Sequence, residues 1–393
     1  MELEASLLGG FSRRRMMAFA GIGVVAAAPL TRTAAAATPA ASPAAGSAPT
    51  ASSLSWPSRG NFGGKAVVGP HQASAAAMID QRTYFGLPRE RTFFYGNLRD
   101  ADGNLYEVVR GVAGTGFGGL NTLFVQSSVG KDTLHVLPML GAAAATSEGS
   151  VVALEGSDAV WRSAPGAKGK PFRFSMSADG SKASWFEQDV LDVNGTLMGP
   201  GLQWHVPDPD GSEFYVSQIY EMRGTILGKP VRGILALDQS YLPQGVLMYS
   251  GQDPLFRPDS HHRCWYTWAT RYTDGSFDAG HFVLGTDRIG FALLTNDKGK
   301  LTLSTDISGT VHLMAKDIWP ERIELTADGT AWEFVPDPKG RMPDLLGGNI
   351  QSVTPQNEGL WRRVGEKRTP AVWFAWGEVQ SGGKVDYRQK NRF

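Results

Sequence analysis

The chain has 393 residues, enough for two or three domains of ordinary size. Its 38 basic and 38 acidic residues cancel, so it lacks the overall positive field that attracts nucleic acid, and no nucleic-acid partner is expected. The 48 glycines and 23 prolines indicate many turns rather than long helices, and the single cysteine, Cys264, excludes an intramolecular disulfide.

The amino terminus has the three parts of an export signal. Residues 12–15, SRRR, precede a short apolar run at 18–30, and small residues suited to cleavage follow. The paired arginines resemble a twin-arginine signal, which implies that the twin-arginine translocase exports the protein already folded. We therefore expect a secreted or periplasmic cell-envelope protein with no stable membrane span in its mature form; an uncleaved amino-terminal anchor is the alternative. Residues 1–55, which end in an Ala/Pro/Ser/Thr tract, are expected to be signal and disordered linker.

From residue 63 onward, short alternating runs are separated by Asp-Gly and Asn-Gly pairs, which supply the positive φ values of tight hairpin turns. These pairs are Asp102-Gly103, Asp179-Gly180, Asn194-Gly195, Asp210-Gly211, Asp274-Gly275 and Asp328-Gly329. Residues 72–85 are the best helix candidate. An all-β chain of this length must close into barrels or stack into sandwiches to avoid open edges. We expect an all-β fold of two consecutive antiparallel β-barrels, over residues 63–297 and, for a smaller one, 298–393.

Four features in order resemble the carotenoid 1,2-hydratase (hydroxyneurosporene synthase) and AttH-like superfamily. They are residues 93–98 with the following Asp-Gly turn, residues 224–238, the aromatic residues 265–268, and the carboxyl end at 358–361 and 371–378. The resemblance implies two lipocalin-like barrels in tandem and covers most of the chain after residue 85. Members of the superfamily range over double-bond hydration, cyclisation and unknown roles, so a shared fold does not fix the function.

Asp238, at the end of an apolar strand, is the sharpest candidate for chemistry. A carboxyl group in an apolar barrel has its pKa raised by desolvation and can act as a general acid. Protonating an alkene also needs a π-rich wall that tolerates positive charge. The aromatic candidates for that wall, as ligand-binding residues, are Tyr95, Tyr241, Trp265 and Trp268. The alternative is that Asp238 caps a turn or pairs with Arg232 or Arg263.

His261 and His262 are further candidates for acid or base catalysis. Adjacent side chains point to opposite faces of a strand, so the two rarely both reach one ion, and no metal site is expected. Three polar residues on predicted strands, Asn97, Glu221 and His281, are candidate ligand contacts. The alternative is that Glu221 is a solvent-facing side chain and His281 a satisfied core histidine.

Two functions remain open. One is a cofactor-free lyase of hydratase or cyclase type that holds an apolar isoprenoid- or polyketide-like molecule in a barrel pocket, with Asp238 as general acid. The other is a lipocalin-like binding or carrier protein without chemistry. The superfamily usually continues after its Asp with a basic residue, an acidic residue, Trp and Gly, whereas residues 239–243 here read QSYLP. That departure favours the carrier, and the resemblance as a whole favours the enzyme.

Overall fold

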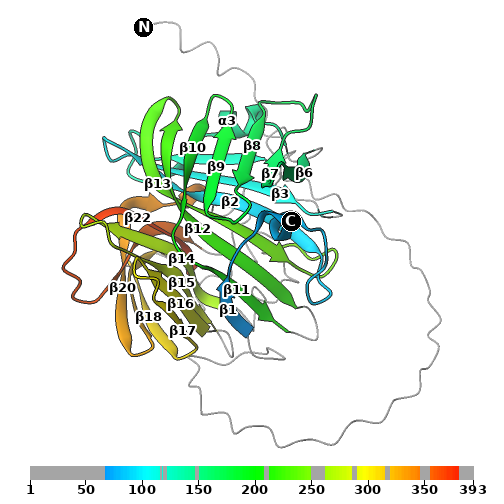
Figure 1. The fold of residues 1–393 in the computed structure, drawn as a ribbon. Coiled ribbons are helices and arrows are strands. Elements are labelled where there is room, and N and C mark those ends of the chain that lie inside the picture. The colour runs from blue at the N-terminus through cyan, green and yellow to red at the C-terminus, as the bar shows by residue number, and fades with distance from the viewer. Residues whose placement is uncertain are drawn as a thin grey trace, which may run out of the picture.

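The computed structural model describes residues 67–379 apart from residues 116, 118–121, 147–149, 208–211, 249–261, 286–289, 315–318 and 346–354 (Figure 1). The predicted signal and linker lie outside this part of the chain. Its helical pieces are short: α2 (Ala75–Ile79), inside the expected helix candidate, α3 (Pro138–Ala143) and the 3-10 turn η2 (Pro343–Leu345). No helix of the described residues has the length and apolar character needed to cross a bilayer. The expected all-β fold is confirmed.

The first sheet has 13 antiparallel strands and forms a half-barrel. Its strand order is β5-β4-β3-β2-β13-β12-β10-β9-β8-β7-β6, and β11 and β1 extend it beside β12. The bounds are β1 (Val67–His71), β2 (Arg89–Asp100), β3 (Leu105–Ala113), β4 (Leu123–Ser127), β5 (His135–Val136), β6 (Val151–Glu155), β7 (Asp158–Arg162), β8 (Phe172–Met176), β9 (Lys182–Glu187), β10 (Leu191–Leu197), β11 (Gly201–Val206), β12 (Glu213–Ile226) and β13 (Lys229–Tyr241). Aromatic and aliphatic side chains, such as Phe94, Trp161 and Trp185, fill its concave face.

The second sheet has nine antiparallel strands in the order β17-β16-β15-β14-β22-β21-β20-β19-β18 and forms a nearly closed barrel. Its strands are β14 (His262–Tyr272), β15 (Phe277–Gly285), β16 (Gly290–Asn296), β17 (Leu301–Ser304), β18 (Ile307–Leu313), β19 (Pro320–Ala327), β20 (Thr330–Arg341), β21 (Gln356–Arg363) and β22 (Pro370–Val379). Strand β18 lies beside β16, which brings the two ends of the sheet together. Trp268, Phe282, Trp332 and Cys264 belong to its core.

The chain changes sheet between Tyr241 and His262. The division expected at residue 297 assigned β14, β15 and β16 to the first barrel, whereas these strands pair within the second sheet. The difference arises because β14 pairs with β22 at the far end of the chain, with Thr267 opposite Trp376. Such a long-range pairing leaves no mark in the spacing of local turns.

Four of the expected Asp-Gly turns connect neighbouring strands. Their glycines have positive φ, as tight turns require: Gly103 at 75°, Gly180 at 73°, Gly275 at 85° and Gly329 at 68°. The turn expected at Asn194-Gly195 was wrong, because both residues lie inside β10. Gly195 is needed there for close packing, since a Cβ on it would lie 1.8 Å from the carbonyl oxygen of Glu221. The Asp210-Gly211 pair lies outside the described residues.

A buried ion pair crosses the interior of the half-barrel from β3 to β9. Arg110 donates from Nε and Nη2 to the two carboxylate oxygens of Glu187, at 2.5 and 2.6 Å, and Trp185 Nε1 donates to Glu187 at 2.8 Å. Both charged side chains are buried. Burial raises the pKa of Glu187, and the guanidinium of Arg110 opposes that rise. The pair therefore depends on both members being present.

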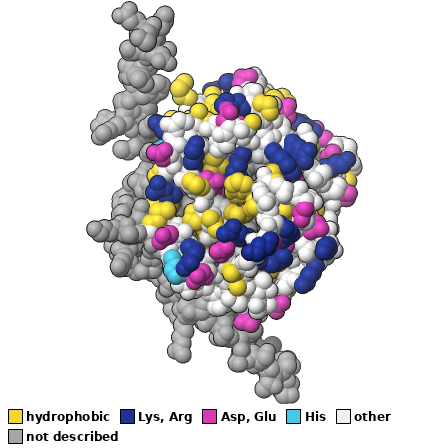
Figure 2. Space-filling view, turned by 90° about the vertical axis from the view of Figure 1, so that its left-hand side faces the viewer, with side chains coloured by type: hydrophobic (Ala, Val, Ile, Leu, Met, Phe, Trp, Pro, Cys, Tyr) yellow, Lys and Arg dark blue, Asp and Glu magenta, His cyan; other side chains and the backbone are white. Residues whose placement is uncertain are grey.

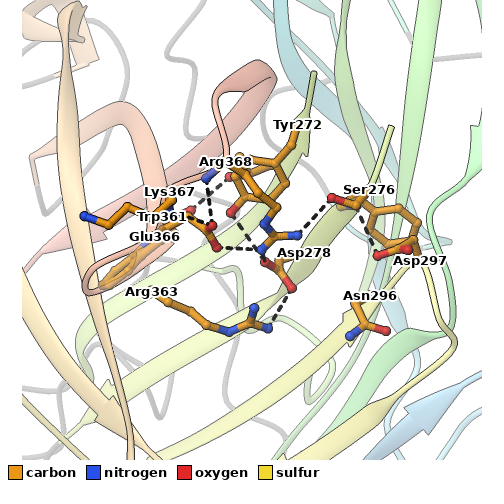
Figure 3. Close-up of polar contacts among 12 residues, drawn as sticks. Tyr272, Ser276, Asp278, Asn296, Asp297, Trp361, Arg363, Glu366, Lys367 and Arg368 are labelled. Carbon is orange, nitrogen blue, oxygen red and sulfur yellow. Dashed lines mark hydrogen bonds and ion pairs between the residues drawn. The ribbon is translucent and has the colours of Figure 1, made fainter. Parts of the chain in front are cut away.

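A second ionic network fastens residues 364–369, between β21 and β22, to β15 (Figure 3). Asp278 of β15 accepts hydrogen bonds from Arg363 at 2.7 Å and from Arg368 at 2.5 Å. Arg368 also binds Glu366 at 2.6 Å, and its guanidinium carbon lies 3.8 Å from the centre of the Tyr272 ring. The hydrogen bond from Arg368 lowers the pKa of Glu366 to about 2.

The two sheets pack face to face, with β2, β12 and β13 against β14, β15 and β22 (Figure 1). We call the side chains between them the intersheet layer. Its apolar part comprises Met198, Ile219, Ile234, Ala236, Ala269, Ala279, Val372 and Phe374. On the outside, the face in Figure 2 carries both basic and acidic side chains, with hydrophobic side chains between them.

Candidate active site between the two sheets

Asp238 lies in the intersheet layer because side chains alternate along a strand. Its neighbour on β13, Leu237, packs into the core of the half-barrel, so Asp238 points to the opposite face, toward the second sheet. Directly across from it are Ser217 of β12 and Phe93 of β2. The Asp238 side chain is fully buried. A carboxyl group thus stands inside a layer that is otherwise largely apolar.

Two tyrosines hold one oxygen of this carboxyl group. The hydroxyls of Tyr95 and Tyr215 donate to Asp238 Oδ2, at 2.7 and 2.5 Å. Tyr95 also contacts Thr267 Oγ1 of β14 at 3.2 Å, which links the site to the second sheet. Asp238 Oδ1 is buried and makes no hydrogen bond of ordinary geometry within the described part of the chain, although the Ser217 hydroxyl lies close enough to lower the pKa of the carboxyl group. When the group is protonated, Oδ1 is therefore the oxygen that can carry the proton and pass it on.

The environment of Asp238 brings the pKa of its carboxyl group close to neutral pH. Burial raises the pKa of Asp238 to about 6, and the hydroxyls of Ser217, Tyr215 and Tyr95 oppose that rise. At pH 7 about one tenth of the molecules would then carry the proton. A group with a pKa near the working pH is suited to general acid catalysis.

His281 and Trp265 complete the site from the second sheet. His281 Nε2 lies 2.9 Å from Ser217 Oγ, and burial lowers the pKa of His281 to about 3, so the ring is neutral. The Trp265 ring centre lies 5.3 Å from that of Tyr215 and 6.4 Å from that of His281. Trp265 and Tyr95 are only half-buried, so the accessible surface begins at these two side chains, whereas the carboxyl group of Asp238 is fully buried.

Two predicted contact residues share the layer but have other partners. Asn97 Nδ2 donates to Glu358 Oε2 at 2.7 Å. Glu221 pairs with Arg232 at 2.6 Å and with Arg271 of β14, so it joins the sheets instead of facing solvent. Because Arg232 is engaged by Glu221, the pairing of Arg232 with Asp238 that the sequence left open is not formed.

The remaining predicted residues lie elsewhere. Tyr241 points into the half-barrel, where its ring centre is 5.2 Å from that of Tyr84. Trp268 points into the second barrel and stacks on Phe282. His261 lies outside the described residues, and only the backbone position of His262, at the start of β14, is described.

Sequence reasoning missed Tyr215, Ser217 and Thr267. The sequence did contain a signal for Tyr215 and Ser217. The turn of the β12–β13 hairpin determines which residue of β12 lies opposite each residue of β13. Leu227 and Gly228 form that turn with φ of 50° and 77°, and counting outward from them places Ser217 opposite Asp238. Within the described residues, no three His, Cys, Asp or Glu side chains gather in a metal-binding arrangement.

The structure is similar to several solved structures. An AttH-like protein from Nitrosomonas europaea shares 16% identity over 76% of this chain and 94% of its own, with a TM-score of 0.45. CghA with Sch210972 shares 12% over 80% and 100%, with a TM-score of 0.41, and kievitone hydratase from Nectria haematococca shares 10% over 83% and 98%, with a TM-score of 0.38. No family model and no curated protein matches the chain.

Identities of 10–16% and TM-scores of 0.45 and below assign neither a residue nor a reaction to this chain. What the site can do therefore depends on its own geometry: a buried acid, two hydroxyl donors, a neutral imidazole and an indole ring.

Proposed function

We propose that this protein is exported and acts on an apolar small molecule, isoprenoid- or polyketide-like, at the intersheet layer, as a cofactor-free lyase of hydratase or cyclase type. Asp238 is the general acid. The observation that carries the proposal is its buried carboxyl group, with Oδ2 held by Tyr95 and Tyr215 and Oδ1 without a hydrogen bond of ordinary geometry among the described residues.

The proposed step moves one proton and keeps the charge balanced. Asp238 Oδ1 gives its proton to one carbon of a double bond, and the other carbon becomes a cation. The resulting carboxylate keeps the two tyrosine hydrogen bonds, which stabilise its charge. The indole of Trp265 offers a π face to the cation. Water or a second double bond then attacks the cation, and the proton lost in that step returns to the Asp238 carboxylate.

A carrier without chemistry is the second candidate, and one observation favours it. Tyr95 bridges Asp238 and Thr267, so the same hydrogen bonds connect the first sheet to the second. A buried polar network of this kind can serve to fix the packing of two sheets without any reaction. Substitution of the acid separates the two functions.

The test compares the wild-type protein with Asp238→Asn, which keeps size and an acceptor oxygen but cannot give the proton. Each is incubated with an extract of apolar metabolites from the producing cells, and bound and free compounds are analysed by mass spectrometry. An enzyme converts a compound, for example by the addition of one water, and Asp238→Asn retains that compound unchanged. A carrier returns the same unchanged compound with both proteins. If neither protein retains an apolar compound, the proposal is wrong in both forms.

Asp100→Asn is the matched control for this comparison. Asp100 binds Asn104 and Tyr106 at the end of β2, away from the intersheet site. The Asp100→Asn variant should therefore convert the compound as the wild type does. Conversion lost equally in both variants would point to a general effect of the substitution.

Export has its own test. Replacing Arg13 and Arg14 by lysine is expected to keep the full-length protein in the cytoplasm, as judged by cell fractionation, because the twin-arginine route depends on that pair. Unchanged export of this variant contradicts the proposed route.

A further inference from the structure

A separate cavity of about 250 Å³ lies on the other face of the first sheet. Strands β1, β11, β12 and β13, helix α2 and the turn at residues 84–87 contribute its walls. Most of the lining is aliphatic or aromatic, as in Val68, Met78, Tyr84, Phe214, Val216 and Tyr241. Such walls are typical of small-molecule sites, and this volume lies just below their usual range of roughly 300–1,000 Å³.

The strand alternation separates this cavity from the candidate active site. Phe214 and Val216 of β12 line the cavity, whereas Tyr215 between them points to Asp238. On β13, Gln239 follows Asp238 in the sequence and points to the opposite face, where it lines the cavity. The sheet thus stands between the two places, and a ligand in the cavity does not touch the acid.

An exposed aromatic side chain lies at the rim of the cavity in an unfavourable backbone conformation. Phe85 is 65% exposed, and its φ of 54° is rare for a bulky residue. Its ring lies flat on that of His205, with centres 4.0 Å apart and planes 5° apart. The preceding Tyr84 points inward and stacks on Phe214. Strained residues persist where the surrounding structure holds them, and they are found especially at ligand clamps.

The polar groups of the lining are neutral and partly without partners. The Nε2 atoms of His71 and His205 are buried and have no hydrogen-bond partner in the described residues. Burial lowers the pKa of both imidazoles, so both rings are uncharged at neutral pH. No Lys, Arg, Asp or Glu is among the described lining residues. A ligand that fits these walls is uncharged and brings one or two hydrogen-bonding groups.

We infer that this cavity binds a small, flat, uncharged compound of about two fused rings that carries a hydroxyl or carbonyl group. The size follows from its volume, since an apolar cavity of ~150 Å³ takes up benzene and this one is larger by about two thirds. The rings lie against Tyr84, Phe214 and Tyr241, and the polar group meets an imidazole nitrogen of His71 or His205. The inference does not depend on the function proposed for Asp238.

The test is a calorimetric titration of the full-length protein with 2-naphthol, an uncharged two-ring probe with one hydroxyl. We expect saturable binding with one site per chain. The anion 2-naphthoate should bind at least tenfold more weakly, because no charged side chain among the described residues lines the cavity and the nearby guanidinium of Arg89 is already bound to the carbonyl oxygen of Met78. Wild-type protein that does not bind 2-naphthol, or that binds 2-naphthoate equally well, overturns the inference.

Phe85→Gly tests the rim of the cavity with little risk to folding, since glycine adopts positive φ without strain. Its affinity for 2-naphthol should fall at least tenfold. The matched control is Leu227→Gly, which removes another exposed apolar side chain at positive φ, 50°, from the β12–β13 turn. This control should bind as the wild type does, and equal affinities of the two variants overturn the inference.

Two further variants locate the probe. Val216→Trp fills the cavity and should abolish binding, with far-UV circular dichroism and the melting temperature as checks of folding. Asp238→Asn should leave the affinity unchanged, so this test and that of the proposed function fail independently. If the probe still binds both Phe85→Gly and Val216→Trp with wild-type affinity, it occupies another place and the inference is wrong.

Discussion

Replacing Asp238 by asparagine should change how the stability of the protein depends on pH. In the folded protein the pKa of Asp238 is raised from 3.8 to about 6 by burial. At 1.36 kcal/mol per pKa unit, the rise corresponds to about 3 kcal/mol. Because the folded state holds the proton more tightly than the unfolded state, this stabilisation is fully present below pH 3.8 and is lost as the pH rises through 6. Asparagine cannot titrate, so the variant lacks this loss.

The assay is urea unfolding of the wild type and Asp238→Asn at pH 4 and pH 8. The free energy of unfolding of the variant minus that of the wild type should be about 2 kcal/mol more positive at pH 8 than at pH 4, since Asp238 of the folded wild type loses its proton mostly between these two values. Any constant cost of the amide cancels in this difference. Asp100→Asn is the control. Burial and hydrogen bonds leave the pKa of Asp100 at about 2, so its difference should be nearly flat over the same range. A flat difference for Asp238→Asn as well would refute the raised pKa.

Four further substitutions test the hydrogen bonds and ion pairs. Tyr215→Phe removes one hydrogen-bond donor to the Asp238 carboxylate. Hydrogen bonds to charged groups are worth ~1.5–3 kcal/mol, so the pKa of Asp238 should rise by about 1–2 units. The rise is measured as a shift toward higher pH in the curve of unfolding free energy against pH, with Asp238→Asn as the reference that does not titrate. Glu187→Gln leaves Arg110 buried without its counter-charge and should lower the free energy of unfolding by ~3–5 kcal/mol. Adding Arg110→Met to this variant should restore most of the lost stability. A loss of less than about 1 kcal/mol in Glu187→Gln alone would contradict the dependence of the pair on both members. Arg368→Ala should cost only about 1 kcal/mol in the same urea assay, because that side chain is partly exposed to water.

Local patterns in the sequence predicted much of this fold. Asp-Gly pairs marked four hairpin turns because positive φ is a property of the residues themselves. Alternation within β14 could also have separated two residues that were expected to form one wall. Trp265 and Trp268 are three positions apart and must face opposite sides of a strand, and they do: one lies in the intersheet layer and the other in the barrel core.

The rest of the site depends on contacts between strands far apart in the chain. Thr267 and His281 reach the site only because the second sheet packs on the first, and Glu221 finds Arg271 in the same way. The change of sheet before β14 was misplaced for this reason, since its partner β22 lies about a hundred residues later. The alternation of apolar and polar residues along a strand shows which face a polar side chain is on, but not which residue of the other sheet it contacts.

The β12–β13 hairpin directs Asp238 into the intersheet layer and Gln239 into the apolar cavity on the other face of the sheet. A shift of its pairing by one residue would move every side chain of β13 to the opposite face. An insertion would place Asp238 where Gln239 now lines the cavity and Leu237 between the tyrosines, and a deletion would place Gln239 between the tyrosines. The hairpin should therefore accept many single substitutions but almost no insertion or deletion of one residue between its turn at Leu227-Gly228 and position 238. In a library of one-residue insertions along β13, the variants with insertions between Gly228 and Asp238 should fail to fold or to bind ligand at either site.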